Sequence, residues 1–190
     1  MAFTLTASGQ VNAEFHVKLI EAHLKDMRSM SRLIGDASDD LANANRKLSR
    51  QLPEDVKASP AWQDVEESQR KIDQAMQAFS KLLQNVVAAE DVFLGRVDRR
   101  GLIAAGAVTD SLEAFANSQR AMSEKIATFV QQLEQQATAM RALPDSARDL
   151  PEFRYVKQVR DATVDALDDS ARVCRKWTTE YESRLRSLKR

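Results

Sequence analysis

Apolar residues recur at helical spacing along most of the chain, in four separate stretches. The clearest rows are Leu19, Met30, Leu41 and Leu52, spaced by 11 residues, and Val65, Ile72, Phe79, Val86 and Phe93, spaced by seven. Rows with these periods are typical of amphipathic helices that pack against other helices. They predict four long helices, over residues 11–50, 61–97, 102–141 and 152–188. Gly35 falls inside the first stretch, where we expect a bend or local irregularity and not a break.

Two proline-containing stretches interrupt these helices, and their sequences resemble each other. QLPEDVKASPAW covers residues 51–62, and ALPDSARDLPEF covers residues 142–153. They contain all four prolines, which form two pairs at the same offset of 91 residues: Pro53 with Pro144, and Pro60 with Pro151. Trp62 and Phe153 are related by the same offset. We interpret this match as an internal duplication, in which one proline closes a helix and the other opens the next.

The duplication predicts two tandem helical hairpins, over residues 11–97 and 102–190, preceded by a flexible tail over residues 1–10. Glycines around the middle of the chain, such as Gly101, indicate a tight turn near residues 98–101 that separates the second helix from the third. Short connections make consecutive helices antiparallel neighbours. We therefore expect an all-α protein, with both hairpins in a single domain that is an up-down-up-down four-helix bundle.

The composition agrees with a helical protein and narrows its class. The 190 residues include only 5 glycines and 4 prolines, and 43% are hydrophobic. The 28 basic and 28 acidic residues cancel, which argues against a general nucleic-acid binder. The N-terminus does not resemble a secretory signal peptide, and the single cysteine, Cys174, favours a reducing compartment. We expect a cytoplasmic location, with export by a signal-peptide-independent system as the alternative.

Few residues offer reactive chemistry, and we expect no catalytic, metal or cofactor-binding site. His16 and His23 lie seven residues apart on about the same side of the first helix, as a metal site would require. The Glu-x-x-His spacing of di-iron bundles does not accompany them. We interpret both histidines as surface residues beside the core stripe. Cys174 falls on a core position of the fourth helix, where we expect a small buried hydrophobe.

Charge is distributed unevenly between the two ends that the bundle topology predicts. Seven basic residues, here called the basic set, collect near one end: Arg96, Arg99, Arg100, Arg184, Arg186, Lys189 and Arg190. They are candidates for docking an acidic protein surface or anionic lipid, or for self-association, although charged residues also simply solvate loops. Trp62 and Phe153, here called the aromatic pair, begin helices at the other end, where acidic residues predominate. We expect this pair to seal the core there or to form a docking site.

These observations favour a non-catalytic binding, scaffolding or adaptor protein that acts through contacts with another protein or by self-association. One alternative is a peripheral membrane or granule-surface binder that uses amphipathic helices. Others are a secreted or secretion-associated bacterial component, and an enzyme or metal carrier with its site inside the bundle. We expect no cofactor and no nucleic-acid partner.

Overall fold

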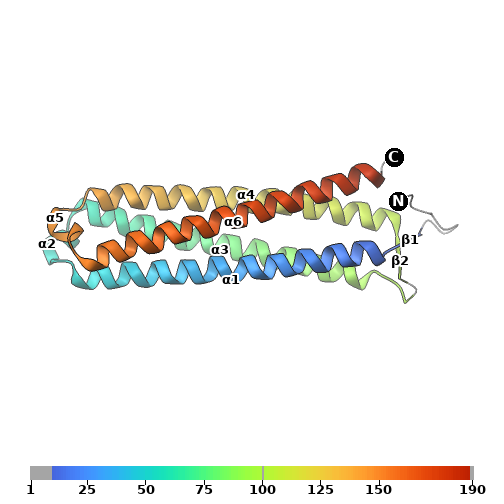
Figure 1. Ribbon diagram of the computed structural model, residues 1–190, viewed down its shortest axis with the longest axis horizontal. Coiled ribbons are helices and arrows are strands. Elements are labelled where there is room, and N and C mark those ends of the chain that lie inside the picture. The colour runs from blue at the N-terminus through green and yellow to red at the C-terminus, as the bar shows by residue number, and fades with distance from the viewer. Residues whose placement is uncertain (1–9, 100, 189–190) are drawn as a thin grey trace. The chain divides into compact units, whose positions relative to one another are not determined.

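Four long helices dominate the computed structural model, which describes residues 10–99 and 101–188. They are α1 (Glu14–Gln51), α3 (Pro60–Gly95), α4 (Ala105–Arg141) and α6 (Pro151–Leu188) (Figure 1). Two short helices, α2 (Glu54–Lys57) and α5 (Asp145–Arg148), lie in the proline connectors, and two short strands, β1 (Gln10–Asn12) and β2 (Leu102–Ala104), precede α1 and α4. The long helices pack against one another, so the prediction of an all-α bundle is confirmed.

The chain divides into two compact units, and each unit takes a segment from all four long helices. Unit 1 comprises the chain up to Met30, Lys81–Ser123 and the chain from Arg172; unit 2 comprises Ser31–Ser80 and Glu124–Ala171. Consecutive segments within each unit run antiparallel (Figure 1). Because each unit contains parts of both hairpins, neither hairpin coincides with a unit. The organisation of the chain as a single domain therefore stays a prediction.

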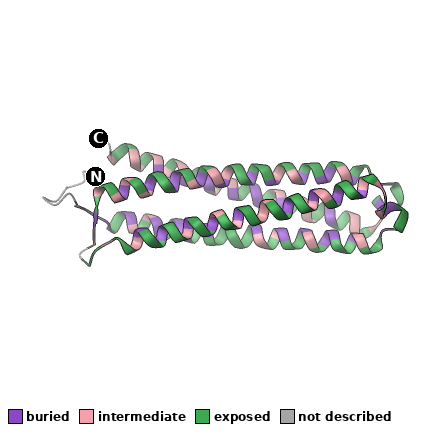
Figure 2. Cartoon of the chain, turned by 180° about the vertical axis from the view of Figure 1, so that it is seen from behind, coloured by how far each residue is buried: buried purple, intermediate pink, exposed green. Residues whose placement is uncertain are grey.

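Each segment of a long helix buries one stripe of side chains within the unit to which that segment belongs (Figure 2). The predicted seven-residue row of α3 is buried throughout, with each side chain at most 2% exposed: Val65, Ile72, Phe79, Val86 and Phe93. Burying a side chain of this size contributes about 1.5–3 kcal/mol. The 11-residue row of the first predicted helix is buried at Met30 and Leu41 of α1 and at Leu52, just after α1. Leu19 is only half-buried because Ile20 takes the core position. The α1 helix continues through Gly35 without a break.

The two proline connectors have the same backbone conformation, as the repeat predicts. Pro53 and Pro144 have φ values of −57° and −64° and ψ values of 151° and 159°. The carbonyl oxygen of each accepts a hydrogen bond from the backbone N–H four residues later, in Lys57 at 3.0 Å and in Arg148 at 3.1 Å. An ion pair within each short helix is also repeated: Lys57 with Glu54, and Arg148 with Asp145. The short helices α2 and α5 lie next to each other (Figure 1).

The first residues of two predicted helices are extended and not helical. Strands β1 and β2 pair antiparallel, with Val11 opposite Ile103. The predicted turn precedes β2: Gly101 has a φ of 73° and its N–H donates to the carbonyl of Asp98 at 2.9 Å. The Asp98 carboxylate also accepts a hydrogen bond from the N–H of Leu102 at 2.8 Å, which directs the chain into the strand. Helices α1 and α4 therefore begin three residues later than predicted, again 91 residues apart.

Candidate functional site

Both histidines lie in the core of unit 1, so the prediction that they are surface residues was wrong. His16 and His23 are each 0% exposed. In this part of α1 the core stripe passes through Ile20 and Met27, which are also 0% exposed. The histidines precede these two residues by four positions each, and residues four apart share one face of a helix. The error arose because the stripe was placed on Leu19, one position away.

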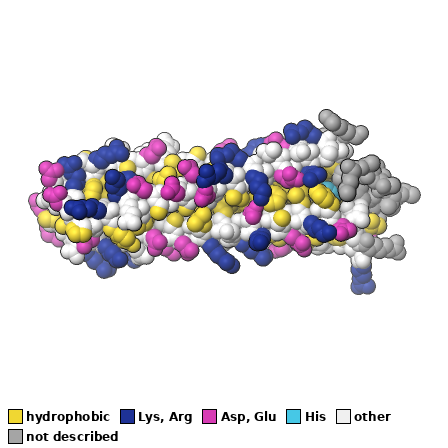
Figure 3. Space-filling model, viewed as in Figure 1, with side chains coloured by type: hydrophobic (Ala, Val, Ile, Leu, Met, Phe, Trp, Pro, Cys, Tyr) yellow, Lys and Arg dark blue, Asp and Glu magenta, His cyan; other side chains and the backbone are white. Residues whose placement is uncertain are grey.

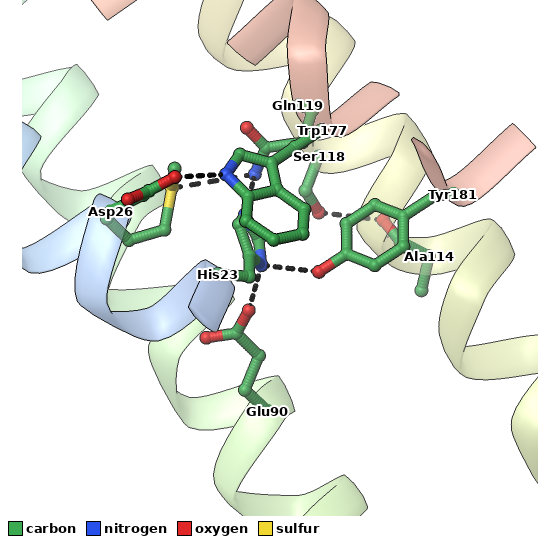
Figure 4. A network of polar contacts seen from close by, with 9 residues as sticks. His23, Asp26, Glu90, Ala114, Ser118, Gln119, Trp177 and Tyr181 are labelled. Atoms are coloured by element: carbon green, nitrogen blue, oxygen red, sulfur yellow. Dashed lines mark hydrogen bonds and ion pairs between the residues drawn. The ribbon is translucent and has the colours of Figure 1, made fainter. Parts of the chain in front are cut away.

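His23 is contacted by a polar side chain from each of the other three long helices (Figure 4). The carboxylate of Glu90, from α3, contacts the ring nitrogen Nδ1. The hydroxyl of Tyr181, from α6, lies 2.6 Å from the same nitrogen. The side-chain amide nitrogen of Gln119, from α4, lies 2.8 Å from Nε2. All four residues, here called the polar cluster, are 0% exposed.

Aromatic rings enclose the His23 imidazole. Its centroid lies 4.8 Å from the Trp177 ring, 5.2 Å from the Tyr181 ring and 6.3 Å from the Phe115 ring. The indole N–H of Trp177 donates to the Asp26 carboxylate at 2.9 Å, which fixes the orientation of this wall (Figure 4). An environment of this kind has a low dielectric, so interactions among the polar groups inside it are strong and an unbalanced charge is costly.

Burial changes the acidity of the groups around the polar cluster. It raises the pKa of Glu90, although the contact with His23 acts in the opposite direction. Burial, together with the negative charge of Glu90, raises the pKa of Tyr181, so the phenol keeps its proton. Burial and the nearby positive charge of Arg184 lower the pKa of His16, which is therefore neutral at neutral pH. Burial acts to raise the pKa of Asp26, but hydrogen bonds from Lys176 and Trp177 outweigh it and the pKa is lowered.

Two members of the polar cluster occupy equivalent positions in the two repeats. Tyr181 follows Glu90 by 91 residues, and both side chains reach the same nitrogen of His23. The position equivalent to His23 is Ala114, which has no polar side chain. The equivalent positions are therefore filled by unlike residues that meet around one histidine.

A second group of buried polar residues, in unit 2, also brings together side chains from equivalent positions of the two repeats. Gln136 follows Asn45 by 91 residues, and both are buried. Their amide nitrogens donate to the same oxygen, Oε1 of Gln69, at 2.6 Å from Asn45 and 3.0 Å from Gln136. Gln69 in turn donates to the Asp73 carboxylate at 2.8 Å. In both units, then, equivalent side chains from the two repeats converge on one acceptor or ring.

The sequence contained a signal for the polar cluster. Glu90 follows Val86 by four residues and precedes Phe93 by three, so its position belongs to the apolar row of α3. A charged residue at a core position is rarely buried without a partner. The partners themselves, Gln119 and Tyr181, lie 96 and 158 residues from His23 in the sequence. Local spacing could not pair residues so far apart.

The basic set lies in unit 1 as far as the structure describes it. Three of its members are exposed, Arg96, Arg99 and Arg186, and Arg184 is half-buried. Arg184 donates to Glu180 at 2.9 Å, and its guanidinium lies 4.3 Å from the Phe15 ring centroid. Arg100, Lys189 and Arg190 lie outside the described residues. Around α2 and α5 of unit 2, acidic and basic side chains are intermixed (Figure 3).

The members of the aromatic pair differ in burial. Trp62 is 2% exposed, and its indole N–H donates to the Glu66 carboxylate at 2.9 Å. Phe153, at the equivalent position of the second repeat, is only half-buried. The equivalence expected for the two rings therefore holds for their sequence positions and not for their packing.

Cys174 is buried in unit 1, as predicted from its core position. Its side chain is 0% exposed, and its Sγ lies 3.9 Å from the Sδ of Met30. Burial raises the pKa of the thiol to about 11, so the sulfur is uncharged at neutral pH. A neutral buried thiol packs as a small hydrophobe and is a poor nucleophile.

A groove between α1 and α3 is one of the concave surfaces of unit 2. It has a volume of about 510 Å³. Its lining includes the buried Trp62 and Val65 and the exposed Arg46 and Arg70. Within the described ranges, no three His, Cys, Asp or Glu side chains come together as a metal site would require.

Comparisons with known proteins found no matching family model, no similar curated protein and no solved structure of similar fold. Function is therefore inferred from the geometry of this chain.

Proposed function

We propose that this chain is a non-catalytic binding or scaffolding protein that engages another protein through the outer surface of its long helices. The observation that carries the proposal is the groove between α1 and α3 of unit 2. Its volume of about 510 Å³ is in the range of concave sites that accept a ligand. Helical surfaces of this kind commonly bind an amphipathic or extended segment of a partner.

Two arginines that line the groove are hydrogen-bonded to side chains of their own helices. Arg70 donates two hydrogen bonds to the Glu67 carboxylate, at 2.9 and 2.7 Å. Arg46 donates to Asn43 at 2.7 Å. Arginine has five N–H donors, so these bonds leave others that can reach carboxylates or backbone carbonyls of a partner. A positioned side chain loses less entropy when it binds, which favours its use at an interface.

The burial pattern favours a protein partner over a membrane surface. An amphipathic helix that binds lipid needs an apolar face directed outward. Here the apolar stripes of the long helices face the core of each unit. In the part of the chain that the structure describes, the large hydrophobic side chains that are exposed come from three helices: Phe15 and Leu33 from α1, Val92 from α3 and Tyr155 from α6. Among the described residues, no helix has the length and hydrophobicity needed to cross a membrane.

We propose a cytoplasmic location and a role there as an adaptor or scaffold. The support for this location is Cys174, a free thiol in the core of unit 1. Free thiols persist in reducing compartments.

Site-specific photo-crosslinking in the native cell tests the proposal. A photoreactive amino acid replaces Ser49, which lines the groove, and in a matched control it replaces Lys157, an exposed residue of unit 2 outside the groove. We expect a discrete adduct of higher mass at Ser49 and not at Lys157. Combining R46E with R70E should remove this adduct while leaving the helical circular dichroism unchanged.

Other outcomes of these experiments would contradict the groove as the binding site or favour a membrane-surface binder. Equal labelling at positions 49 and 157, or an adduct that survives both arginine reversals, would contradict a role for the groove. Co-sedimentation of the unaltered protein with phosphatidylserine vesicles, in the absence of any protein adduct, would favour the membrane-surface alternative instead.

A further inference from the structure

The polar cluster of unit 1 places a carboxyl group and a phenol around one ring nitrogen of a histidine in a site without exposed surface. Glu90 and Tyr181 both contact Nδ1 of His23, and Gln119 contacts Nε2. None of the four side chains is exposed. Since solvent cannot stabilise a charge here, the number of protons that the cluster holds must follow from its internal balance of charge.

Only one protonation level leaves the pair of His23 and Glu90 neutral overall. With no dissociable proton, an ionised Glu90 beside a neutral imidazole leaves a net charge of −1. With two, an imidazolium beside a protonated carboxyl leaves +1. With one proton, the pair is either an imidazolium and a carboxylate or a neutral imidazole and a carboxylic acid. Both forms sum to zero charge, which is the least costly state in a buried site.

The surrounding charged groups do not supply a compensating charge. On α1, Asp26 lies close to His23, but it is held by Lys176 and Trp177 of α6. Beside Glu90, the negative charge of Asp91 and the positive charge of Arg28 act in opposite directions on its pKa. From α4 the facing side chains are Gln119 and Phe115, which do not titrate. From α6 the facing group is the phenol of Tyr181, beside which Glu180 adds another negative charge.

Gln119 is suited to both one-proton forms. With its amide nitrogen toward His23, Gln119 suits an Nε2 that accepts a hydrogen bond, which is the form in which a neutral imidazole carries its hydrogen on Nδ1. A half-turn of the amide would present Oε1, which can accept a hydrogen bond from Nε2–H of an imidazolium. The two arrangements contain the same number of protons and differ only in which group carries the charge.

We propose that the polar cluster holds one dissociable proton throughout the neutral pH range and thereby makes the packing of unit 1 depend on pH. In an unfolded chain, a solvated histidine and a solvated glutamate both lose their protons below about pH 7. Above that pH, folding of unit 1 takes up one proton from solution. Its unfolding constant therefore rises by about tenfold for each pH unit, until the folded cluster releases the proton.

The sign of this dependence agrees with the raised pKa of Glu90. A carboxyl whose pKa is raised in the folded state stabilises it at low pH, and the stabilisation is lost as the pH rises through the folded value. His16 provides the opposite dependence within the same unit. Its pKa is lowered, so it stabilises the folded state above the ordinary histidine value of 6.5, and the stabilisation is lost as the pH falls below it.

The two tryptophans allow unit 1 to be observed alone in the full chain. Trp177 belongs to unit 1 and lies 4.8 Å from the His23 ring, whereas Trp62 belongs to unit 2. In a W62F background, urea unfolding is followed by Trp177 fluorescence from about pH 5.5 to 8. We expect the unfolding constant at fixed urea to rise about tenfold between pH 7 and 8. Adding E90Q, which puts a neutral amide in place of the carboxyl, should reduce this change to less than about twofold.

H16Q in the same background is the matched control. It should keep the change of about tenfold between pH 7 and 8 and lose the dependence at the acidic end, between about pH 5.5 and 6.5. Equal alkaline slopes in the E90Q protein and its parent would overturn the proposal, as would a parent whose unfolding constant does not change between pH 7 and 8.

A second measurement avoids variants and applies even if E90Q does not fold. The chain has two histidines, so ¹⁵N-labelled histidine and ¹³C-carboxyl-labelled glutamate report the protonation of His23 and Glu90 directly. At pH 7 we expect an imidazolium beside a carboxylate, a neutral imidazole beside a carboxylic acid, or exchange between them. A neutral imidazole beside an ionised Glu90 would show that the cluster holds no dissociable proton and would refute the inference.

Discussion

Trp62 and Phe153 occupy equivalent positions in the two repeats, but Trp62 is more deeply buried. Replacing each by alanine therefore tests how the loss of stability depends on burial. Trp62 is 2% exposed, so W62A removes a fully buried aromatic side chain and leaves a cavity in unit 2. The expected loss is about 3–5 kcal/mol in the free energy of unfolding. Phe153 is only partly buried, so F153A removes less burial than the loss of a core phenylalanine would. We expect a loss of about 1–2 kcal/mol for that variant.

The hydrogen bond of Trp62 adds little to this difference. Its indole N–H donates to Glu66, whose side chain is exposed and can bond to water after the substitution. The bond itself is therefore worth about 1 kcal/mol or less. W62F keeps a ring in the site while removing the donor, and it should cost less than about 2 kcal/mol.

Urea unfolding of the full chain, followed by circular dichroism at 222 nm, measures these losses. We expect the free energies of unfolding to rank the parent first, then F153A, and W62A last. Losses of equal size for W62A and F153A would refute the argument from burial. Losses below about 1 kcal/mol for both would indicate that the aromatic pair is not part of the core and would revive the hypothesis that it docks a partner.

Three further predictions follow from the repeat, the thiol and the basic set. Hairpins 11–97 and 102–190, expressed separately, should self-associate or lack cooperative unfolding, because each leaves its apolar face uncovered. A hairpin that is monomeric in analytical ultracentrifugation and unfolds cooperatively in urea would contradict this. The pKa of Cys174 is raised from 9.0 to about 11, so the free energy of unfolding should fall by about 2–3 kcal/mol as the pH rises over that interval. Urea titrations across this pH range should show a smaller fall for C174A than for the parent. Reversing Arg99, Arg100, Arg186 and Arg190 to Glu should leave folding intact and remove any salt-sensitive association with partners, lipid or itself; sedimentation that matches the parent from low to high salt would refute that role.

Helix boundaries were predictable from the sequence where a local signal determines them. Pro60 and Pro151 open α3 and α6 within one residue of the predicted starts, because proline fits the first turn of a helix and disrupts its interior. The strands β1 and β2 were missed for the opposite reason. Each is three residues long, and its extended conformation depends on a partner strand elsewhere in the chain. No local pattern identifies such a pair.

The polar cluster shows where sequence reasoning about the candidate site failed. The spacing of His16 and His23 correctly placed them on one side of α1, but it could not decide whether that side faces the core or the solvent. A shift of one residue, from Leu19 to Ile20, decides it. Histidine is intermediate in its tendency to be buried, so residue type could not decide the matter either. Only the packing of three other helices around His23 does so.

A duplicated chain raises a question of pairing that the two buried polar groups help to answer. Each hairpin could in principle pack against the same hairpin of a second copy. Two copies of the first hairpin would then bring together two Glu90 carboxylates and two His23 rings where the chain has one of each with Tyr181 and Ala114, which doubles the number of buried ionisable groups. Two copies of the second would bring Tyr181 near Ala114 in place of His23, leaving its hydroxyl without the ring nitrogen. Unlike residues at equivalent positions thus favour packing of one repeat with the other, because they penalise the like pairing.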